Sequence, residues 1–202
     1  MSASFIGVCG YASDFSVDGL NYTLLSATDQ TCALSAGDYK GELVIPDEVT
    51  FKGRNLKVVS VEDEAIENLP ELTSCKIGKN VTQIGKYAFN NTPELMELVI
   101  PPNVTEIKEF SFRNCGIRKL VIEASDDLIK LGVSEFTTIK GQFSTPPFNM
   151  CQNLEEVYFG RPYVQLKGDG YSVYKSLFYG NATIKKVTLG SHVNMLGGAR
   201  YQ

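Results

Sequence analysis

An internal repeat limits how this chain can fold. The segment that begins at Val81 and ends at Ile100 starts again at Val104, 23 residues later, and the same apolar positions recur upstream from Val58. The shared pattern is VxxIxxxAFxxxxxLxxLxI. It weakens but persists downstream, in 148–159 and 178–189. A unit of this length buries its apolar side only by stacking on its neighbours, so the repeat predicts a solenoid.

Each unit divides into extended and turn segments. Leu98, Val99 and Ile100 alternate between inward and outward positions, as residues of a short strand do. The segment 81–84 is expected to form a second extended edge. Ala88-Phe89 predicts a short helical turn between the two, with the phenylalanine pointing inward. The fold class is therefore a mostly β solenoid with short helical turns.

The repeat resembles the BspA-like leucine-rich repeats of bacterial surface and secreted proteins. The residues that carry the resemblance are Val81, Ile84-Gly85, Ala88-Phe89, Leu95, Leu98 and Ile100-Pro101. A cysteine typical of the family follows the phenylalanine at Cys115 and Cys151. The resemblance covers 58–202, with departures at 123–147 and 161–177. It implies a leucine-rich-repeat solenoid, a right-handed β–α superhelix, that is secreted or attached to the cell surface and adheres to host proteins or other cells.

The chain is expected to have three parts. Residues 1–12 are interpreted as the remnant of a secretion signal or as sequence added for expression. Residues 13–57 are expected to form an N-terminal β-cap, because Asp18-Gly19 between alternating apolar residues predicts a hairpin. Residues 58–202 are the solenoid, whose last repeat is incomplete because Val193 and Leu196 only open a unit. The uncapped end suggests a monomer or a weak end-to-end dimer.

Composition excludes several functions. The chain has 202 residues, of which 43% are apolar and 21% charged, enough to bury a core. Its net charge of -4 disfavours nucleic acid as a partner. No apolar run approaches the length of a membrane-spanning helix. His192 is the single histidine and there is no CxxC motif, so we expect no cofactor and no metal site.

Two cysteines recur at one repeat position. Cys115 and Cys151 each stand three residues after a phenylalanine, in successive units. They could form a disulfide or stack as small buried thiols. The second interpretation is favoured, because free cysteine is among the most buried residue types. The sequence does not decide between them.

Two surfaces are candidates for binding. The first is the outward position of the concave strands, occupied by Lys76, Val99, Val121, Tyr158 and Thr188. Exposed apolar side chains in a row are typical of a contact surface, although valine also suits any strand. The second is the insertion that carries Arg161, Tyr171 and Tyr174. Tyrosine and arginine are enriched at binding hot spots, and they also pack long loops onto a core.

Three functions remain open at this stage. The first is a non-catalytic binding module that adheres to an extracellular protein or glycan, with host matrix protein as the partner class that the resemblance implies. The second is a structural spacer that presents another domain of a longer protein. The third is a glycan-active enzyme, which would need two carboxylates facing each other from different coils.

Overall fold

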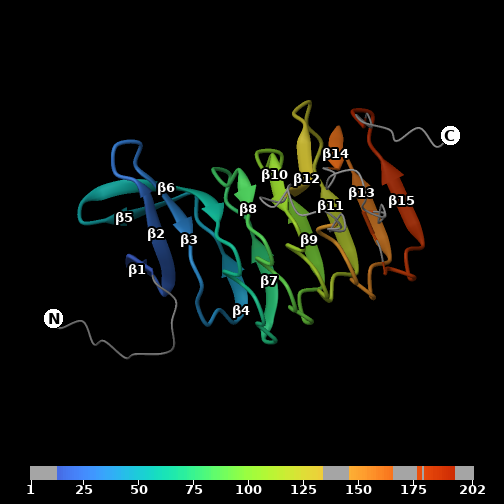
Figure 1. Ribbon diagram of the computed structural model, residues 1–202, viewed down its shortest axis with the longest axis horizontal. Helices are drawn as coiled ribbons and strands as arrows, with labels where there is room; N and C mark the ends of the chain where they lie inside the picture. Colours follow the sequence, from blue (N-terminus) through green and yellow to red (C-terminus); the bar gives the residue numbers. More distant parts are fainter. Residues whose placement is uncertain (1–12, 134–145, 166–176, 179, 194–202) are drawn as a thin grey trace, which may run out of the picture.

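Two rows of strands run along the chain in the computed structural model, which describes residues 13–133, 146–165, 177–178 and 180–193 (Figure 1). The long sheet has the order β1-β2-β3-β6-β8-β10-β12-β14, with β5 beside β6. Its strands are β1 (Phe15–Val17), β2 (Leu20–Ser26), β3 (Thr31–Leu34), β5 (Glu48–Phe51), β6 (Arg54–Val61), β8 (Gln83–Ile84), β10 (Glu106–Lys108), β12 (Ile129–Val133) and β14 (Tyr163–Gln165).

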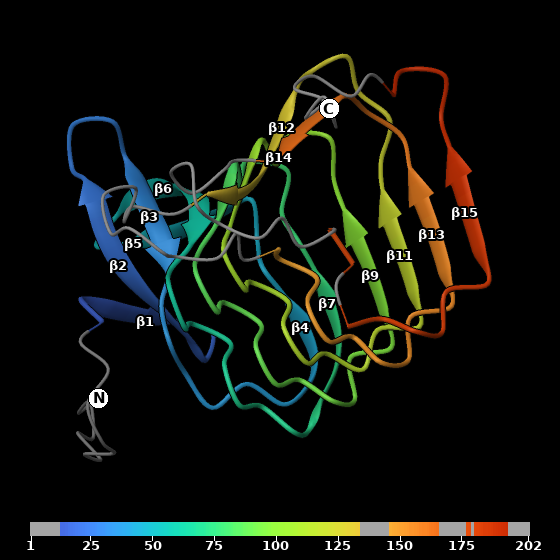
Figure 2. The same cartoon turned by 45° about the vertical axis from the view of Figure 1, so that its right-hand side comes forward.

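The second row lies on another side of the coil (Figure 2). It contains β4 (Gly41–Val44), β7 (Leu72–Lys76), β9 (Glu97–Ile100), β11 (Lys119–Ile122), β13 (Glu156–Phe159) and β15 (Lys186–Leu189). From β6 to β15 the chain alternates between the two rows, so each of these coils supplies one strand to each row. Residues one repeat apart pair directly, as Leu98 does with Leu120. The predicted solenoid is confirmed.

The second row is interrupted between β7 and β9. These strands lie side by side, but β4 pairs only with β7, and β9 begins a separate sheet that continues to β15. In the next coil the amide of Glu123 donates to the carbonyl of Ile100. In the coil of β9 the residue equivalent to Glu123 is Pro101. Proline has no N–H, so the corresponding hydrogen bond from β9 to β7 cannot form.

The Asp18-Gly19 hairpin is confirmed. Asp18 and Gly19 have φ values of 49° and 81°, and β1 and β2 pair in antiparallel fashion on either side of them. Two successive residues with positive φ match the right-handed twist of the flanking strands. Beyond the hairpin, β3 is antiparallel to β2 and parallel to β6, so the N-terminal strands and the coils share one sheet.

The expected helical turns differ from what the structure shows. No helix occurs in the described ranges, and the segment around Ala88-Phe89 is a series of turns. The physical reason is that backbone amides of this segment form hydrogen bonds between coils, which a helix would use within its own turn. The amides of Phe89 and Asn91 donate to carbonyls of the next coil, those of Ser111 and Arg113, instead of to their own turn. Tyr87 and Asn91 have φ values of 53° and 59°, which a right-handed helix does not allow.

The core is a column of side chains that repeats along the solenoid. The rings of Phe89, Phe112 and Phe148 are fully buried and stack on one another. Gly85 is required by close packing between coils, because a β-carbon there would lie 2.5 Å from the backbone of Glu62 and Asp63. The glycine of the repeat thus lets adjacent turns approach closely enough for the phenylalanine column to form.

Candidate functional site

The outward side of β4, β7, β9, β11, β13 and β15 forms one surface, which we call the strand face. Parallel pairing aligns Val99 with Val121, Val121 with Tyr158, and Tyr158 with Thr188. Val44 and Lys76 are aligned in the same way on β4 and β7. Four of the five residues expected on the concave strands, Val99, Val121, Tyr158 and Thr188, are therefore aligned in one row, and Lys76 lies on β7, the strand next to β9.

Apolar side chains on this face are open to solvent. Val44 and Val99 are 55% and 44% exposed. Val121 and Tyr158 are half-buried, and Lys76 and Thr188 are exposed. Their neighbours in the strand, such as Leu98 and Ile100, are buried. The alternation leaves Val99, Val121 and Tyr158 as an apolar stripe on the strand face that the core does not use, and Lys76 separates Val44 from this stripe.

A row of alternating charge runs beside this stripe. Glu97, Lys119, Glu156 and Lys186 are exposed and stand directly opposite one another on neighbouring strands. An acidic residue is thus paired in register with a basic one on each neighbouring strand, and opposite charges across a strand pair are mutually stabilising. The row therefore strengthens the register of the four strands and makes the surface polar along one side.

The face is hollowed at two places. A hollow of about 270 Å³ lies over β11, β13 and β15, lined by Val121, Tyr158 and Thr188 together with Lys119, Glu156 and Lys186. A larger one of about 580 Å³ lies where β4, β7 and β9 end. Its lining includes Val44, Lys76, Pro101, Pro102 and the ion pair between Lys79 and Asp47, whose charged atoms are 3.0 Å apart. Both are concave sites that combine apolar walls with a few charged groups.

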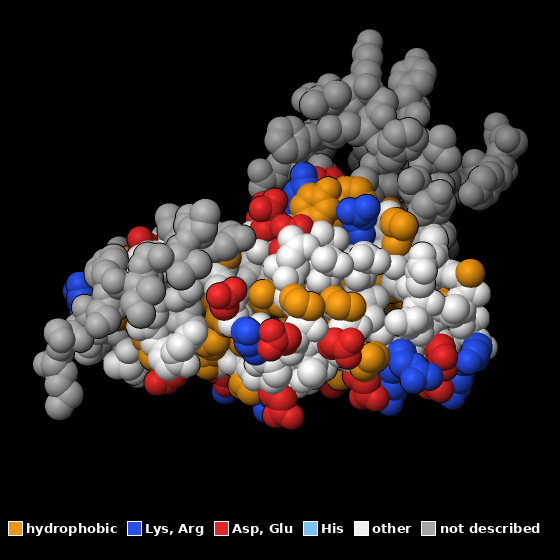
Figure 3. Space-filling model, turned by 90° about the horizontal axis from the view of Figure 1, so that it is seen from below, with side chains coloured by type: hydrophobic (Ala, Val, Ile, Leu, Met, Phe, Trp, Pro, Cys, Tyr) orange, Lys and Arg blue, Asp and Glu red, His pale blue; other side chains and the backbone are white. Residues whose placement is uncertain are grey.

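A further charged cluster lies at the start of β11, β13 and β15. The Glu155 carboxylate forms ion pairs with the Lys185 ammonium, at 3.2 Å, and with the Arg118 guanidinium, at 3.3 Å. The hydrogen bond from Lys185 is the main cause that lowers the pKa of Glu155, with Arg118 adding to it. Figure 3, seen from the edge where the strands start, shows acidic and basic side chains interspersed over the C-terminal coils.

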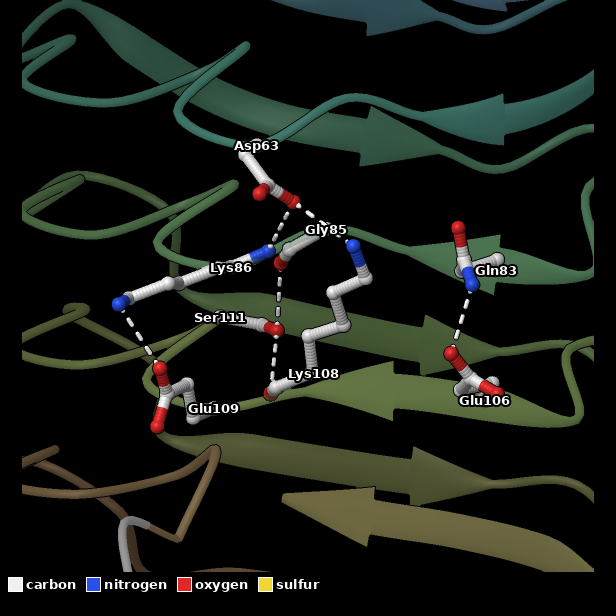
Figure 4. A network of polar contacts seen from close by, with 8 residues as sticks. All are labelled: Asp63, Gln83, Gly85, Lys86, Glu106, Lys108, Glu109 and Ser111. Atoms are coloured by element: carbon white, nitrogen blue, oxygen red, sulfur yellow. Dashed lines mark hydrogen bonds and ion pairs between the residues drawn. The ribbon is translucent and has the colours of Figure 1, made fainter. Parts of the chain in front are cut away.

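Another polar network lies on the turns that follow β6, β8 and β10 (Figure 4). The Lys86 ammonium lies 2.8 Å from a Glu109 carboxylate oxygen, and this contact is the main cause that raises the pKa of Lys86. The Lys86 amide donates to Asp63, whose carboxylate also lies 3.4 Å from the Lys108 ammonium. Because these contacts join the turns of three coils, the network supports stacking of the turns.

Arg161 does not belong to a binding surface. Its side chain is fully buried, and its guanidinium donates to the backbone carbonyls of Asp127, Pro102 and Val104. Burial lowers its pKa. The expectation that Arg161 contacts a ligand is therefore wrong, because its donors hold two loops of the solenoid together. Tyr171 and Tyr174 lie outside the described residues.

The cysteines of the repeat are free thiols. Cys32, Cys115 and Cys151 are buried and Cys75 is half-buried, and none of the four forms a disulfide. The thiols of Cys115 and Cys151 lie 3.0 Å from the carbonyl oxygens of Phe89 and Phe112, one coil back. Of the two alternatives, the structure shows stacked thiols and no disulfide.

His192 lies next to an acidic side chain. Its Nδ1 is 2.7 Å from a carboxylate oxygen of Asp126, in an exposed pair. Among the described residues, no group of three or more His, Cys, Asp or Glu side chains is placed to hold a metal ion. The same residues contain no helix that is long and apolar enough to cross a membrane.

Sequence reasoning missed the larger hollow. It lies where the second row is interrupted, beside Pro101 and Pro102. The signal was the doubled proline directly after a strand, because proline removes a backbone donor. Reasoning from the repeat also missed the alternation of Glu97, Lys119, Glu156 and Lys186, which becomes visible once the strands are aligned.

Comparison with protein families identifies the repeat. Residues 47–140 match the BspA type leucine rich repeat region in six copies. This part of the chain is therefore a BspA-type leucine-rich repeat region, and the resemblance read from the sequence is confirmed. None of the curated proteins compared matches the sequence.

Solved structures share the fold. A leucine rich repeat protein of T. pallidum superposes with a TM-score of 0.57 at 19% identity, over 89% of this chain and 82% of its own. A leucine rich cell surface protein from Faecalibacterium prausnitzii gives 0.56 at 19% identity, over 93% of this chain and 44% of its own. A leucine-rich repeat protein from Bacteroides capillosus gives 0.53 at 16%, over 88% and 99%. At these identities the likeness shows the fold.

Proposed function

We propose that this protein is a non-catalytic binding module of the cell surface or the extracellular space, and that it adheres to an extracellular protein or glycan through the strand face. The observation that carries the proposal is the apolar stripe of Val99, Val121 and Tyr158, in which Val99 is 44% exposed and the other two are half-buried. Contiguous apolar surface of this kind is typical of contact sites.

The surroundings of the stripe support the proposal. Tyr158 lines a hollow between two lysines and a glutamate, so an apolar contact there is combined with groups that can bind polar or charged ligand atoms. Tyrosine is enriched where binding energy concentrates. The cell surface protein of F. prausnitzii, which has the same fold, supports an extracellular location.

The test is surface-based binding of the purified protein to a panel of extracellular-matrix proteins and glycans. The variant Val99→Glu combined with Tyr158→Ala changes the stripe without touching the core. The matched control is Lys130→Ala, an exposed residue on β12 of the long sheet. Circular dichroism checks that all three proteins are folded alike.

Saturable binding that is lost in the double variant and kept in the control would support the strand face as the site. Binding that survives the double variant would overturn that assignment. An absence of binding across the panel would favour a spacer that presents another domain. The glycan-active alternative would be supported by turnover of a glycan that the protein binds.

A further inference from the structure

The charge row of the strand face has a definite order. Figure 2 shows β9, β11, β13 and β15 side by side and running in the same direction. From β9 to β15 the row is negative, positive, negative and positive, with the exposed side chains of Glu97, Lys119, Glu156 and Lys186. Read from β15 to β9, the row has the opposite sign at every position. It is therefore complementary to a reversed copy of itself.

A two-fold axis parallel to the strands reverses the strand order between two copies. If the axis lies between β11 and β13, two strand faces meet with Glu97 opposite Lys186 of the second copy and Lys119 opposite Glu156. Each contact then occurs twice, as in every isologous interface. A two-fold axis along the row keeps the strand order and sets each charge opposite its own copy, which is repulsive. Charge therefore selects the first arrangement.

The apolar stripe fits the same arrangement. The parallel register that aligns the charges also aligns the stripe two residues further along each strand. Val121 would lie opposite Tyr158 of the second copy, so that these half-buried side chains cover each other. Val99, which is 44% exposed, would lie opposite Thr188, which lines the hollow of about 270 Å³ over β11, β13 and β15. An exposed valine of one copy thus meets the hollow of the other.

The next row along the strands leaves room for a second copy. It consists of Pro101, Glu123, Gly160 and Gly190, and the amides of the last three donate to the preceding coil. The two-fold axis sets Glu123 opposite Gly160, so this carboxylate meets no like charge. A β-carbon at Gly190 would lie 2.9 Å from the Tyr158 hydroxyl, so glycine there lets the Tyr158 side chain reach across to the next coil.

We propose that the strand face binds a second copy of this protein, face to face, with the two solenoid axes antiparallel and the strands nearly aligned. Two sheets pack in this way about 10 Å apart, at an angle of about 30° that their twist sets. The proposal rests on the proposed function, because it names the partner of the same face and makes adhesion homophilic. Four short strands bury little area, so the contact is weak and gains strength where many copies stand on one surface.

An exchange of charges tests the arrangement. Lys119→Glu and Glu156→Lys each create two like-charged pairs when the variant pairs with itself, whereas a mixed dimer of the two variants has opposite charges at every pair. In sedimentation equilibrium we expect each variant alone to self-associate about ten-fold more weakly than the wild-type protein. An equimolar mixture should regain most of this loss. Because both variants carry the same kind of like-charge contact within their own strands, a change in folding alone cannot produce the recovery.

Two further variants complete the experiment. Lys130→Glu makes the same change in charge on β12 of the long sheet, opposite Glu106, and should associate as the wild-type protein does. Val99→Glu places a charge in the apolar contact and should abolish self-association. Circular dichroism checks that all variants are folded.

Three results overturn the proposal. They are a wild-type protein that is monomeric at every concentration, charge variants that self-associate as the wild type does, and a mixture that associates no better than either variant. The second result would assign association to another surface. If the protein is monomeric but loses matrix or glycan binding in the variant Val99→Glu with Tyr158→Ala, the proposed function stands and this partner is wrong. Charge-dependent self-association without binding across the panel would instead leave the second copy as the partner of the strand face.

Discussion

The rings of Phe89 and Phe112 stack with their centroids 4.9 Å apart and their planes 21° from parallel, although 23 residues separate them in the chain. Phe112 stacks in turn on Phe148 at 5.3 Å. Each ring fills the space between two coils, so each coil depends on its neighbours for a closed core. This dependence is what makes a repeat of this length cooperative.

Replacing the central ring should therefore destabilise the whole solenoid. Phe112→Ala removes a fully buried side chain that contacts rings on both sides. We expect the free energy of unfolding to fall by about 3–5 kcal/mol, which urea denaturation measures. The exposed Met96 serves as the control, because Met96→Ala opens no cavity. A loss below about 1 kcal/mol in Phe112→Ala would contradict the stacked core.

A ladder of asparagines is expected to stabilise the turns. The side-chain Nδ2 of Asn91 donates to Oδ1 of Asn68 at 2.8 Å, and Oδ1 of Asn91 accepts from Nδ2 of Asn114 at 3.0 Å. The backbone φ of Asn91 is 59°. Asn91→Ala loses both bonds and places a β-carbon in the left-handed region, so we expect a cost of about 1–2 kcal/mol. Asn91→Gly keeps the backbone relaxed and should cost less. Thermal unfolding of both variants separates the two effects, and equal costs would assign the whole effect to the ladder.

Arg161 should be irreplaceable by lysine. Its planar guanidinium reaches the carbonyls of Asp127, Pro102 and Val104 at once, at 3.0, 2.8 and 2.9 Å. Both Arg161→Lys and Arg161→Met leave carbonyls without donors, and the buried one of Val104 should cost about 1–3 kcal/mol. We expect both variants to lower the midpoint of chemical denaturation by a similar amount. Full rescue by lysine would mean that the charge matters and the geometry does not.

Lys119 should stabilise the strand face in a salt-dependent way. It stands between Glu97 and Glu156, so Lys119→Glu creates a row of three carboxylates. Like charges across a strand pair are destabilising, and we expect a loss of about 1 kcal/mol at low salt. Screening at 1 M salt should recover much of the lost stability. Lys119→Gln is the control, and equal losses in both variants at all salt concentrations would contradict the charge row.

The described thiols should resist alkylation in the folded protein. Burial raises the pKa of Cys32 to about 11 and that of Cys75 to about 12, and it raises the pKa of Cys115 as well. Only the thiolate reacts, so at pH 8 these groups are protonated as well as shielded. In a Cys9→Ser background, iodoacetamide should modify the buried Cys32 and Cys115 only after unfolding, and the half-buried Cys75 more slowly than in the unfolded chain, as read by mass spectrometry. Rapid labelling of Cys32 or Cys115 in the native protein would contradict their burial.

The repeat could be predicted from the sequence because its apolar positions are fixed by stacking. Val81, Ile84, Phe89 and Leu98 recur at one spacing, and all are buried. The row of candidate residues on the strand face followed from the same spacing, since side chains alternate along a strand. The conformation of the turns could not be predicted from this spacing, because Ala88-Phe89 is locally compatible with a helix. The amides of Phe89 and Asn91 bond to the next coil instead, and a local pattern carries no information about that choice.

Sequence alone thus determined the solenoid, its period and the inward positions, because hydrophobic burial in a repeat depends only on spacing along the chain. The tertiary structure decided the rest. It buried Arg161, which composition had suggested for a surface, because carbonyls from two distant loops converge around its guanidinium. It aligned Glu97, Lys119, Glu156 and Lys186 in one row of alternating charge. Contacts between segments far apart in the chain set these features, and such contacts exist only once the coils are stacked.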